Sequence, residues 1–564
     1  MRWVRSAILA LVAWPMVCQA QGFEVGSLPP PLATENSLEI CLNSRYSQHS
    51  LNRTPASAQQ ISNILWAAGR VPVTGAYRTI YIATPTGTYL YDPATHSTSL
   101  HSDEATNDGA FALIYEAERD FDTGASFMPA MLASVSLGNS SESTMASCPK
   151  GLGYPTTRLI FGVQAVKGLT HELTARCSVH EGQPGWLPAP LTAGDNSFEG
   201  VLANLNYTST FAQTDLTLPQ VSQILWAGYG CTAHMTTNGR AGLTVPSAFA
   251  NYYLTGSIYL VNGSGVYRYH NRNPSTNTAT RDHRIEDIRS AVSVRPRPPS
   301  AGDDEDAVDP RVTLRSALEG LPVAPCYVIL CLDFSYAGQH YAQLETGFVA
   351  GNMLMQATAI GMGCHFEPDL TTAERAGIHS ATRIPVSHVP QAVVSIGPPA
   401  ALVSVSVGLQ GEGRPDAGWA IPLTVRFFAP GADATSAPAY EFELITARSP
   451  DGNSAVCTAS GVAPGVYDIA VVGGSTLASL KRNVVVSLPA TSVDLGTLLE
   501  GNLNRDGAID LGDYAILSRH WLLSESQAEY DAQADCDRNG LVDAADLALL
   551  AANWLWTSPV EIGP

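Results

Sequence analysis

Two acidic twelve-residue segments near the C-terminus, 502–513 and 535–546, constrain this chain more than any other feature. Calcium takes about six to eight oxygen ligands, and a loop of this length supplies them from positions 1, 3, 5, 7, 9 and 12. Gly507 and Gly540 stand at position 6, where such a loop turns sharply. The sequence therefore predicts two calcium ions, with these ligands: Asn502, Asn504, Asp506, Ala508, Asp510 and Asp513 in the first loop, and Asp535, Asp537, Asn539, Leu541, Asp543 and Asp546 in the second, where Ala508 and Leu541 contribute backbone carbonyls.

The sequence in and around the loops distinguishes them from regulatory EF-hands. Position 12 is Asp rather than the bidentate Glu, and the apolar segments 514–523 and 547–556 each predict one helix after a loop, with no helix before it. Runs of Asn, Asp and Gly are also common in solvated turns, but two complete matches in tandem favour metal binding. With these features, residues 499–556 resemble a type I dockerin.

The resemblance implies a partner, since dockerins bind cohesin modules on a scaffold or cell-surface protein. Positions 10 and 11 of a loop usually make that contact, and here they are Leu511-Gly512 and Ala544-Ala545. These are not the Ser/Thr pair of the best-known cellulosomal dockerins. The sequence therefore does not identify the cohesin, or decide whether the host builds a polysaccharide-degrading complex.

The N-terminus predicts export. Arg2 and Arg5 make residues 1–5 a short basic region, and an apolar run follows at 7–13. Cys18 and Ala20 are small residues at positions −3 and −1 of a cleavage site. Residues 1–20 are therefore expected to be a signal peptide, and the protein to be secreted or extracytoplasmic. The apolar run is shorter than the roughly 20 residues that span a bilayer, so no membrane span is expected.

Of the ten cysteines, Cys18 falls in the signal peptide, which leaves nine in the mature chain. In an oxidising compartment some are expected to pair, with an odd one left over. Cys326 and Cys331 lie at odd spacing in an apolar strand pattern, so they are expected to face opposite sides and not to pair with each other.

Composition bounds the partners and the number of domains. The chain of 564 residues is 45% hydrophobic, enough for several packed domains. Its formal net charge of −20 disfavours nucleic acid and anionic membranes as partners. The acidic stretch 303–309 is expected to be a surface loop rather than a metal site, because it lacks a glycine turn to organise the carboxylates.

An internal repeat lies within residues 40–400. The helix pattern of 61–69 recurs at 221–228, and the hairpin pattern of 80–92 recurs at 258–270. The offsets are 160 and 178 residues, so the second copy carries about 18 extra residues between helix and hairpin. The sequence therefore predicts two copies of one α/β unit.

The second copy also contains Pro246-Ser247-Ala248 before an apolar strand, and a long helical pattern over 341–363. The order of these motifs resembles the nitroreductase superfamily, closest to the dehydrogenases that oxidise azolines in peptide maturation. That family binds FMN in a groove between two subunits. The resemblance therefore implies that the two fused copies form an intramolecular pseudo-dimer, with these cofactor contacts: Pro246, Ser247, Ala248, Asn352, Gly361 and Gly363.

The sequence departs from the family at several flavin positions. The first copy lacks the Pro-Ser-Ala loop and its matching core segment, 158–169, is short, so at most one flavin site is expected. The phosphate-binding arginines are absent from 205–211; the first copy keeps Arg45 but has His49 in place of a second one. Pro368 aligns with a backbone donor to the flavin, and proline has no N–H.

Two functions follow for the tandem: an FMN-dependent oxidoreductase, or a catalytically inactive module of the same fold that serves binding or structure. No catalytic residue is identified.

Residues 399–498 show short alternating strands between Gly, Pro and Asp turns, which predicts an all-β sandwich. Ala463-Pro-Gly-Val-Tyr467 resembles the turn of transthyretin-like, carboxypeptidase-regulatory domains, which usually act as spacers. The expected chain is thus multidomain: an α+β nitroreductase-like tandem, an all-β sandwich and a small α-helical calcium-binding dockerin. Its predicted boundaries are signal peptide 1–20, degenerate copy 21–185, second copy 186–398, sandwich 399–498, dockerin 499–556 and tail 557–564.

Overall fold

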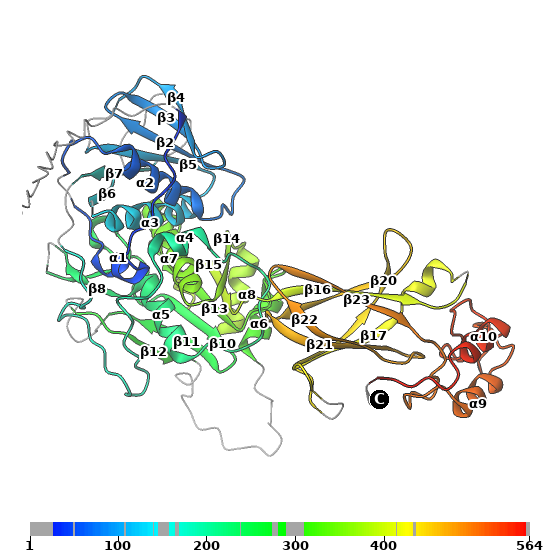
Figure 1. The fold of residues 1–564 in the computed structure, drawn as a ribbon. Coiled ribbons are helices and arrows are strands. Elements are labelled where there is room, and N and C mark those ends of the chain that lie inside the picture. The colour runs from blue at the N-terminus through cyan, green and yellow to red at the C-terminus, as the bar shows by residue number, and fades with distance from the viewer. Residues whose placement is uncertain are drawn as a thin grey trace, which may run out of the picture.

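The computed structural model describes residues 26–48, 51–105, 109–138, 140–144, 157–163, 168–236, 239–272, 280–288, 309–412, 414–432 and 436–559. An α/β body is followed by a β-sandwich that extends from it, and a small helical module lies at the far end of the sandwich (Figure 1). The predicted signal peptide, His49 and most of the acidic stretch 303–309 lie outside the described residues. Within the described residues, no helix is long and apolar enough to cross a membrane.

The first α/β unit is an antiparallel sheet of seven strands in the order β1-β4-β3-β2-β5-β7-β6. Among the described residues, three helices belong to it, and α2 contains the predicted repeat segment 61–69. The elements are β1 (Gly26–Ser27), α1 (Leu38–Ser44), α2 (Ala58–Arg70), β2 (Arg78–Thr84), β3 (Gly87–Asp92), β4 (Ser97–Ser102), β5 (Phe111–Ala117), α3 (Asp120–Ser136), β6 (Ser140–Thr144) and β7 (Thr157–Gly162).

The second unit has a six-stranded antiparallel sheet in the order β12-β11-β10-β13-β15-β14, and β8 and β9 form a separate pair. Its elements are α4 (Phe198–Ala203), α5 (Leu218–Tyr229), β8 (Cys231–Met235), β9 (Ala241–Leu243), η1 (Ala248–Ala250), β10 (Ile258–Asn262), β11 (Gly265–His270), β12 (Arg284–Asp287), α6 (Pro310–Ala317), β13 (Cys326–Asp333), α7 (His340–Ala359), β14 (Gly363–Pro368), α8 (Thr372–Thr382) and β15 (His388–Gly397).

The two repeated helices begin in the same way. The side chain of Ser57 caps α2 and that of Thr217 caps α5, and each forms a capping box with the glutamine three residues later. Such boxes satisfy backbone N–H groups that a helix start leaves without partners. The repeated hairpins form as β2–β3 and β10–β11, each with its strands in antiparallel register.

The two units also share a polar network that joins the repeated helix to the hairpin. In the first, Ser62 Oγ lies 2.9 Å from His96 Nε2, and Tyr91 OH lies 2.9 Å from His96 Nδ1. In the second, the equivalent distances from Ser222 and Tyr269 to His283 are 2.8 and 2.9 Å.

Both serines donate to a proline carbonyl, Pro29 in the first unit and Pro188 in the second. Burial lowers the pKa of His283 to about 3, so its ring is neutral at physiological pH. Because the serine hydroxyls are buried and already donate to carbonyls, the networks fix the fold and are not nucleophilic sites.

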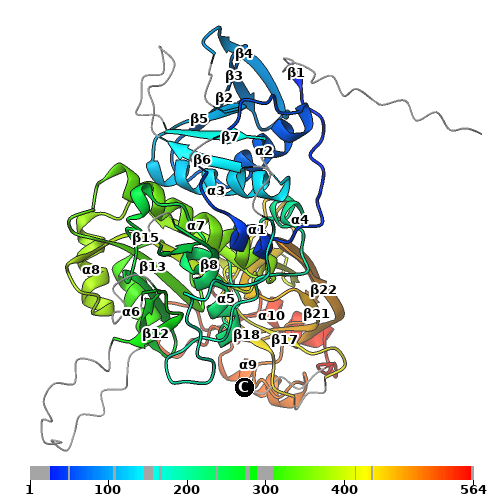
Figure 2. The same ribbon diagram turned by 90° about the vertical axis from the view of Figure 1, so that its left-hand side faces the viewer.

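The long helices α3 and α7 lie between the two sheets and pack against each other (Figures 1 and 2). A Cβ atom added at Gly124 would overlap the Leu344 carbonyl oxygen, and one added at Gly347 would overlap the Phe121 carbonyl oxygen. The contact is reciprocal: each glycine meets the residue three positions before the other. Glycine is required here because the two backbones approach directly.

Segment 158–169 is expected from the sequence to match the long helix of the second copy, and this match is wrong. Its first part forms strand β7, and α3 is the helix that pairs with α7. The helix was missed because α3 contains Pro129 and is buried on all sides, which removes the helical periodicity of apolar residues.

Two four-stranded sheets form the predicted sandwich, in the orders β19-β20-β16-β23 and β18-β17-β21-β22. Alternate residues of β16 are buried, as the period of two in the sequence predicts. The elements are β16 (Ala401–Leu409), η4 (Asp416–Trp419), β17 (Pro422–Phe428), β18 (Tyr440–Ile445), β19 (Ala447–Arg448), β20 (Ala455–Val462), β21 (Gly465–Gly473), β22 (Ser479–Val486) and β23 (Ala490–Leu498).

The C-terminal module has two helices, α9 (Leu511–Arg519) and α10 (Ala544–Ala552), one after each acidic loop. Each starts about three residues earlier than predicted, because the aspartate at position 9 caps the helix and the one at position 12 completes a capping box. A small core holds the module together, built mainly from Leu503, Ile509, Leu517, Cys536, Val542 and Leu550.

Candidate functional site

The first acidic loop is organised around the carboxylate of Asp513. Its Oδ1 accepts from the backbone N–H of Leu503 (2.6 Å) and Asn504 (3.1 Å), and its Oδ2 accepts from that of Asp510 (2.8 Å). Asn502 at position 1 is buried, and its Oδ1 has no hydrogen-bond partner among the described residues. A buried acceptor without a donor costs stability unless a cation or water meets it.

The second loop repeats this geometry. Asp546 Oδ1 accepts from the N–H of Cys536 (2.6 Å) and Asp537 (3.2 Å), and Oδ2 accepts from that of Asp543 (2.7 Å). Asp535, Asp537 and Asp546 are all buried and offer ligand oxygens within 4.8 Å of one another. The Tyr530 hydroxyl donates to Asp535 Oδ2 at 2.6 Å and orients that carboxylate from outside the loop.

Burial and mutual repulsion act on these acids. Burial, together with the neighbouring charges of Asp537 and Asp535, raises the pKa of Asp546 to about 6. Burial also raises the pKa of Asp537 and of Asp513. Three buried carboxylates in one place, with hard oxygen donors, fit a divalent cation of the calcium type.

The remaining predicted ligands lie at the loop surfaces. Asn504 Nδ2 donates to Asp506 Oδ2 (2.7 Å), and Asn539 Nδ2 donates to Asp537 Oδ2 (3.1 Å). Gly507 and Gly540 have φ angles of +84° and +92°, which confirms the predicted turn at position 6. Each loop thus brings positions 1 to 5 back toward position 12. Ala508, Asp510, Leu541 and Asp543 follow on the strand-like return of each loop into its helix.

The predicted flavin contacts lie in the second α/β unit, and their polar groups bond to protein atoms. Ser247 Oγ accepts from the N–H of Tyr252 at 2.7 Å. Asn352 is fully buried and its amide donates to the Ala227 carbonyl at 3.0 Å, so it joins α7 to α5. Its Oδ1 has no hydrogen-bond partner in the part of the chain that the structure describes. Pro246 is buried, whereas Ala248 is half-buried at the start of η1.

Gly361 ends helix α7 with a φ of +76°, and Gly363 starts strand β14 against the side chain of Thr208. These two glycines therefore serve the chain reversal between the helix and the strand. Pro368, the last residue of β14, faces Ala392 on the neighbouring strand.

Arg45, the single retained family arginine, is buried beside the same segment. Its Nε donates to the Thr244 carbonyl (3.1 Å) and its Nη2 to the Leu243 carbonyl (2.9 Å), while Nη1 has no hydrogen-bond partner within the described ranges. Burial lowers the pKa of Arg45 to about 10. The guanidinium group therefore holds the strand before Pro246 in place. The Arg45, Ser247 and Asn352 side chains thus each bond to protein atoms in this fold, and each bond ties one segment of the α/β body to another.

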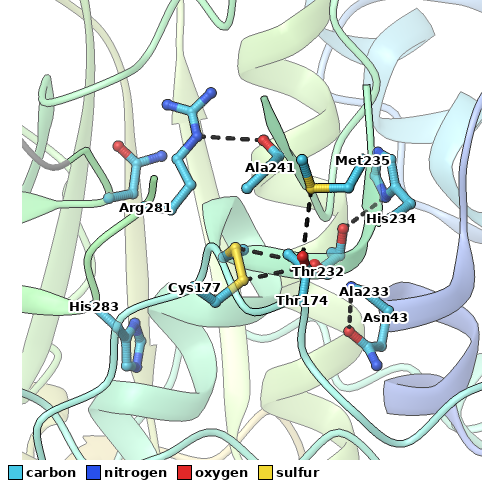
Figure 3. Close-up of a disulfide and its surroundings, with 12 residues drawn as sticks. Asn43, Thr174, Cys177, Thr232, Ala233, His234, Met235, Ala241, Arg281 and His283 are labelled. Carbon is cyan, nitrogen blue, oxygen red and sulfur yellow. Dashed lines mark hydrogen bonds between the residues drawn. A yellow bond between two sulfur atoms is a disulfide. The ribbon is translucent and has the colours of Figure 1, made fainter. Parts of the chain in front are cut away.

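A disulfide between Cys177 and Cys231 joins the segment after the first unit to the start of β8 (Figure 3). Close by, the Asn43 side chain of α1 accepts from the Ala233 N–H at 2.9 Å, and Arg281 Nε donates to the Ala241 carbonyl at 3.4 Å. The sequence predicted pairing without naming the partners. Among the described cysteines, Cys326 and Cys331 form no disulfide, and they lie in separate core clusters on opposite faces of β13, as predicted.

In the comparison with known families, residues 500–553 match the Dockerin type I domain. This match confirms the predicted dockerin. No curated protein matches the chain. The described residues confirm a multidomain architecture, with α/β units, an all-β region and the C-terminal dockerin.

Among solved structures, the chain is similar to a protein from Anabaena variabilis described as a nitroreductase (12% identity, 63% of this chain, 93% of that chain, TM-score 0.41). It is also similar to a type II cohesin-X-dockerin complex from Acetivibrio cellulolyticus (18% identity, 28% of this chain, 97% of that chain, TM-score 0.22). A third similar structure is the E. coli microcin synthetase McbBCD complex with truncated pro-MccB17 bound (15% identity, 34% of this chain, 66% of that chain, TM-score 0.23).

Proposed function

Because residues 500–553 form a type I dockerin, we propose that this is an exported modular protein that docks, with two calcium ions, to a cohesin module on a scaffold or cell-surface protein. The observation that carries the proposal is the buried cluster of Asp535, Asp537 and Asp546. These carboxylates lie close together without a cationic side chain bonded to them among the described residues, so a bound cation would neutralise them.

Two observations support export. Residues 1–20 have the pattern of a signal peptide. The disulfide between Cys177 and Cys231 is of a kind that forms and persists in oxidising compartments.

For the cohesin contact, we propose the exposed starts of α9 and α10. Leu511 is 69% exposed and Tyr514 is 43% exposed on α9, whereas Ala544 and Ala545 are exposed on α10. The α9 face offers the larger apolar area, and exposed apolar side chains of this size commonly mark interaction surfaces.

The docking proposal is tested by flowing the purified full-length protein over immobilised cohesin modules. We expect binding to one class of cohesin in calcium, and loss of that binding in EDTA. The variant Asp506→Ala/Asp537→Ala should behave in calcium as the parent does in EDTA, whereas Arg482→Gln, on the sandwich, should bind as the parent does. Binding that survives both EDTA and the double substitution would contradict the proposal.

We also propose that residues 21–398 form a fused pseudo-dimer. The reciprocal approach of Gly124 and Gly347 supports this, because a two-fold interface pairs residue i with j and residue j with i. The backbone bridge between Ser37 and Ser197, at the starts of α1 and α4, supports it as well. Asn36 donates to the Ser136 carbonyl (2.8 Å), and Asn196 donates to the Ala359 carbonyl (2.7 Å), at matching positions of the two units.

For the activity of the tandem, we propose the cofactor-free alternative: a module of nitroreductase-like fold that binds or supports structure and is displayed by the dockerin. It is favoured over an FMN-dependent oxidoreductase by the engagement of Arg45, Ser247 and Asn352 with protein atoms.

We expect the purified protein to be colourless and added FMN to be bound weakly at best, since each missing charge-assisted phosphate contact costs about 1.5–3 kcal/mol. Fluorescence titration with FMN measures this. If the protein purifies yellow, with one flavin bound per chain, the cofactor-free proposal is contradicted and the oxidoreductase is favoured. A titration in Ser247→Trp serves as the control, since any quenching at this segment should disappear when the indole fills it.

A further inference from the structure

One loop of the sandwich lies against the second calcium loop. A Cβ atom added at Gly411 would come within 2.6 Å of Asp537 Cβ, and one added at Gly418 would come within 3.0 Å of Arg538 Cβ. Gly411 has a φ of +111°, a conformation that favours glycine. The backbone of the sandwich therefore touches the calcium loop next to a predicted ligand, with no room for a side chain between them.

Arg414, between these two glycines, reaches into the calcium loop itself. Its side chain is 1% exposed, and Nη2 donates to the carbonyl of Cys536 at 2.8 Å. Cys536 lies between the ligands Asp535 and Asp537. The same guanidinium donates to the carbonyls of Gln410 (2.6 Å) and Gly418 (3.1 Å), which fix it to its own loop.

A buried carboxylate completes this contact. Arg414 Nη2 lies 3.2 Å from Glu500 Oε1, and Ser475 Oγ donates to Glu500 Oε2 at 2.7 Å. Glu500 is the residue through which the sandwich leads into the first calcium loop, and its side chain is 2% exposed. The ion pair therefore joins three parts: the sandwich loop, the connection between the domains, and the second calcium loop.

The end of the second helix is held by the same group of residues. Asn553, just after α10, donates through Nδ2 to Gln410 Oε1 (2.6 Å) and to the Glu500 carbonyl (2.7 Å). Both the start of the second calcium loop and the end of its helix are thus bonded to the sandwich or to the connection. At the first loop, the exposed Arg505 of the loop itself donates to the Gly474 carbonyl of the sandwich, and among the described residues no buried arginine of the sandwich is bonded to that loop.

We propose that Arg414 is a positioning residue for the second calcium loop, so that calcium binding there is coupled to the contact between sandwich and dockerin. The bond to the Cys536 carbonyl fixes the peptide group between Cys536 and Asp537, whose N–H donates to Asp546 Oδ1. The orientation of that peptide group places the Asp537 carboxylate relative to that of Asp546. Coupling between two such sites is reciprocal, so calcium also tightens the contact. The inference rests on the proposed calcium binding of the dockerin and deepens it.

The test measures calcium affinity of the second loop alone, by titration calorimetry on the full-length protein carrying Asp506→Ala/Asp510→Ala in the first loop. In this background, Arg414→Gln should weaken calcium binding roughly ten- to hundredfold, as expected for one lost bond to a charged group. Arg482→Gln is the matched control: Arg482 also pairs with a buried carboxylate of the sandwich, Asp468, and lies outside the contact. Its calcium affinity should equal that of the background.

Arg414→Gln alone leaves Glu500 buried without its partner, which can unfold the sandwich for reasons unrelated to calcium. The second variant, Arg414→Met/Glu500→Gln, removes both charges and should keep the unfolding temperature of the sandwich close to that of the background. Its calcium affinity should still fall at least tenfold, because the bond to the Cys536 carbonyl is gone. An affinity within twofold of the background in this folded variant would overturn the proposal. If the background itself binds no calcium, the proposed calcium function fails and this inference fails with it.

Discussion

Removal of calcium is expected to unfold the dockerin while the α/β tandem stays folded. The dockerin core is small, and its second loop buries three carboxylates that repel one another when no cation is bound. A ligand that binds only the folded state stabilises it by about 4 kcal/mol when present at 1,000 times its dissociation constant. For so small a domain that amount is most of the folding free energy. Scanning calorimetry with and without EDTA measures the effect.

The calorimetric transition of the dockerin should disappear or fall strongly in EDTA, and return when calcium is restored. Asp537→Ala should reproduce part of the loss in the presence of calcium. Asp416→Ala serves as a control, because its carboxylate is 87% exposed, pairs with Arg448 at the surface and lies outside the loops. A dockerin transition that is insensitive to EDTA would refute the calcium assignment.

Gly347→Val is expected to destabilise the tandem by at least about 3 kcal/mol, and Gly124→Val by a similar amount. In each case the new side chain meets a backbone carbonyl of the opposite helix, and neither backbone can withdraw because both helices are buried. Chemical denaturation of the tandem, followed by circular dichroism, measures the loss.

In the full-length protein, Gly474→Ala of the sandwich is the control, since the added Cβ atom would meet only the tip of Arg505 at 3.4 Å. It should leave stability nearly unchanged. If Gly347→Val unfolds at the same denaturant concentration as the parent, then α3 and α7 do not meet as described, and the pseudo-dimer proposal loses its main support.

Sequence reasoning succeeded where the signal is local. Each predicted calcium loop keeps its predicted ligands within twelve consecutive residues, so spacing alone predicts their convergence. The repeated helices carry their own caps, and the repeated hairpins carry alternation with a central turn, so both copies were recognisable.

What sequence reasoning missed depends on contacts between distant segments. His96 lies 34 residues from Ser62, whereas His283 lies 61 residues from Ser222, so no common spacing reveals that the two networks are equivalent. Arg414 bonds to a residue 122 positions away, and the disulfide spans 54 positions. The flavin contacts suggested by resemblance stay a prediction, because a motif residue such as Asn352 can keep its place in a helix while its amide bonds to a neighbouring helix.

Calcium titration calorimetry on the full-length parent protein tests the central claim most directly. The account predicts saturable binding of two ions per chain, one ion in Asp537→Ala, and none in Asp506→Ala/Asp537→Ala. Absence of calcium binding in the parent, or an unchanged stoichiometry in the double variant, would contradict it.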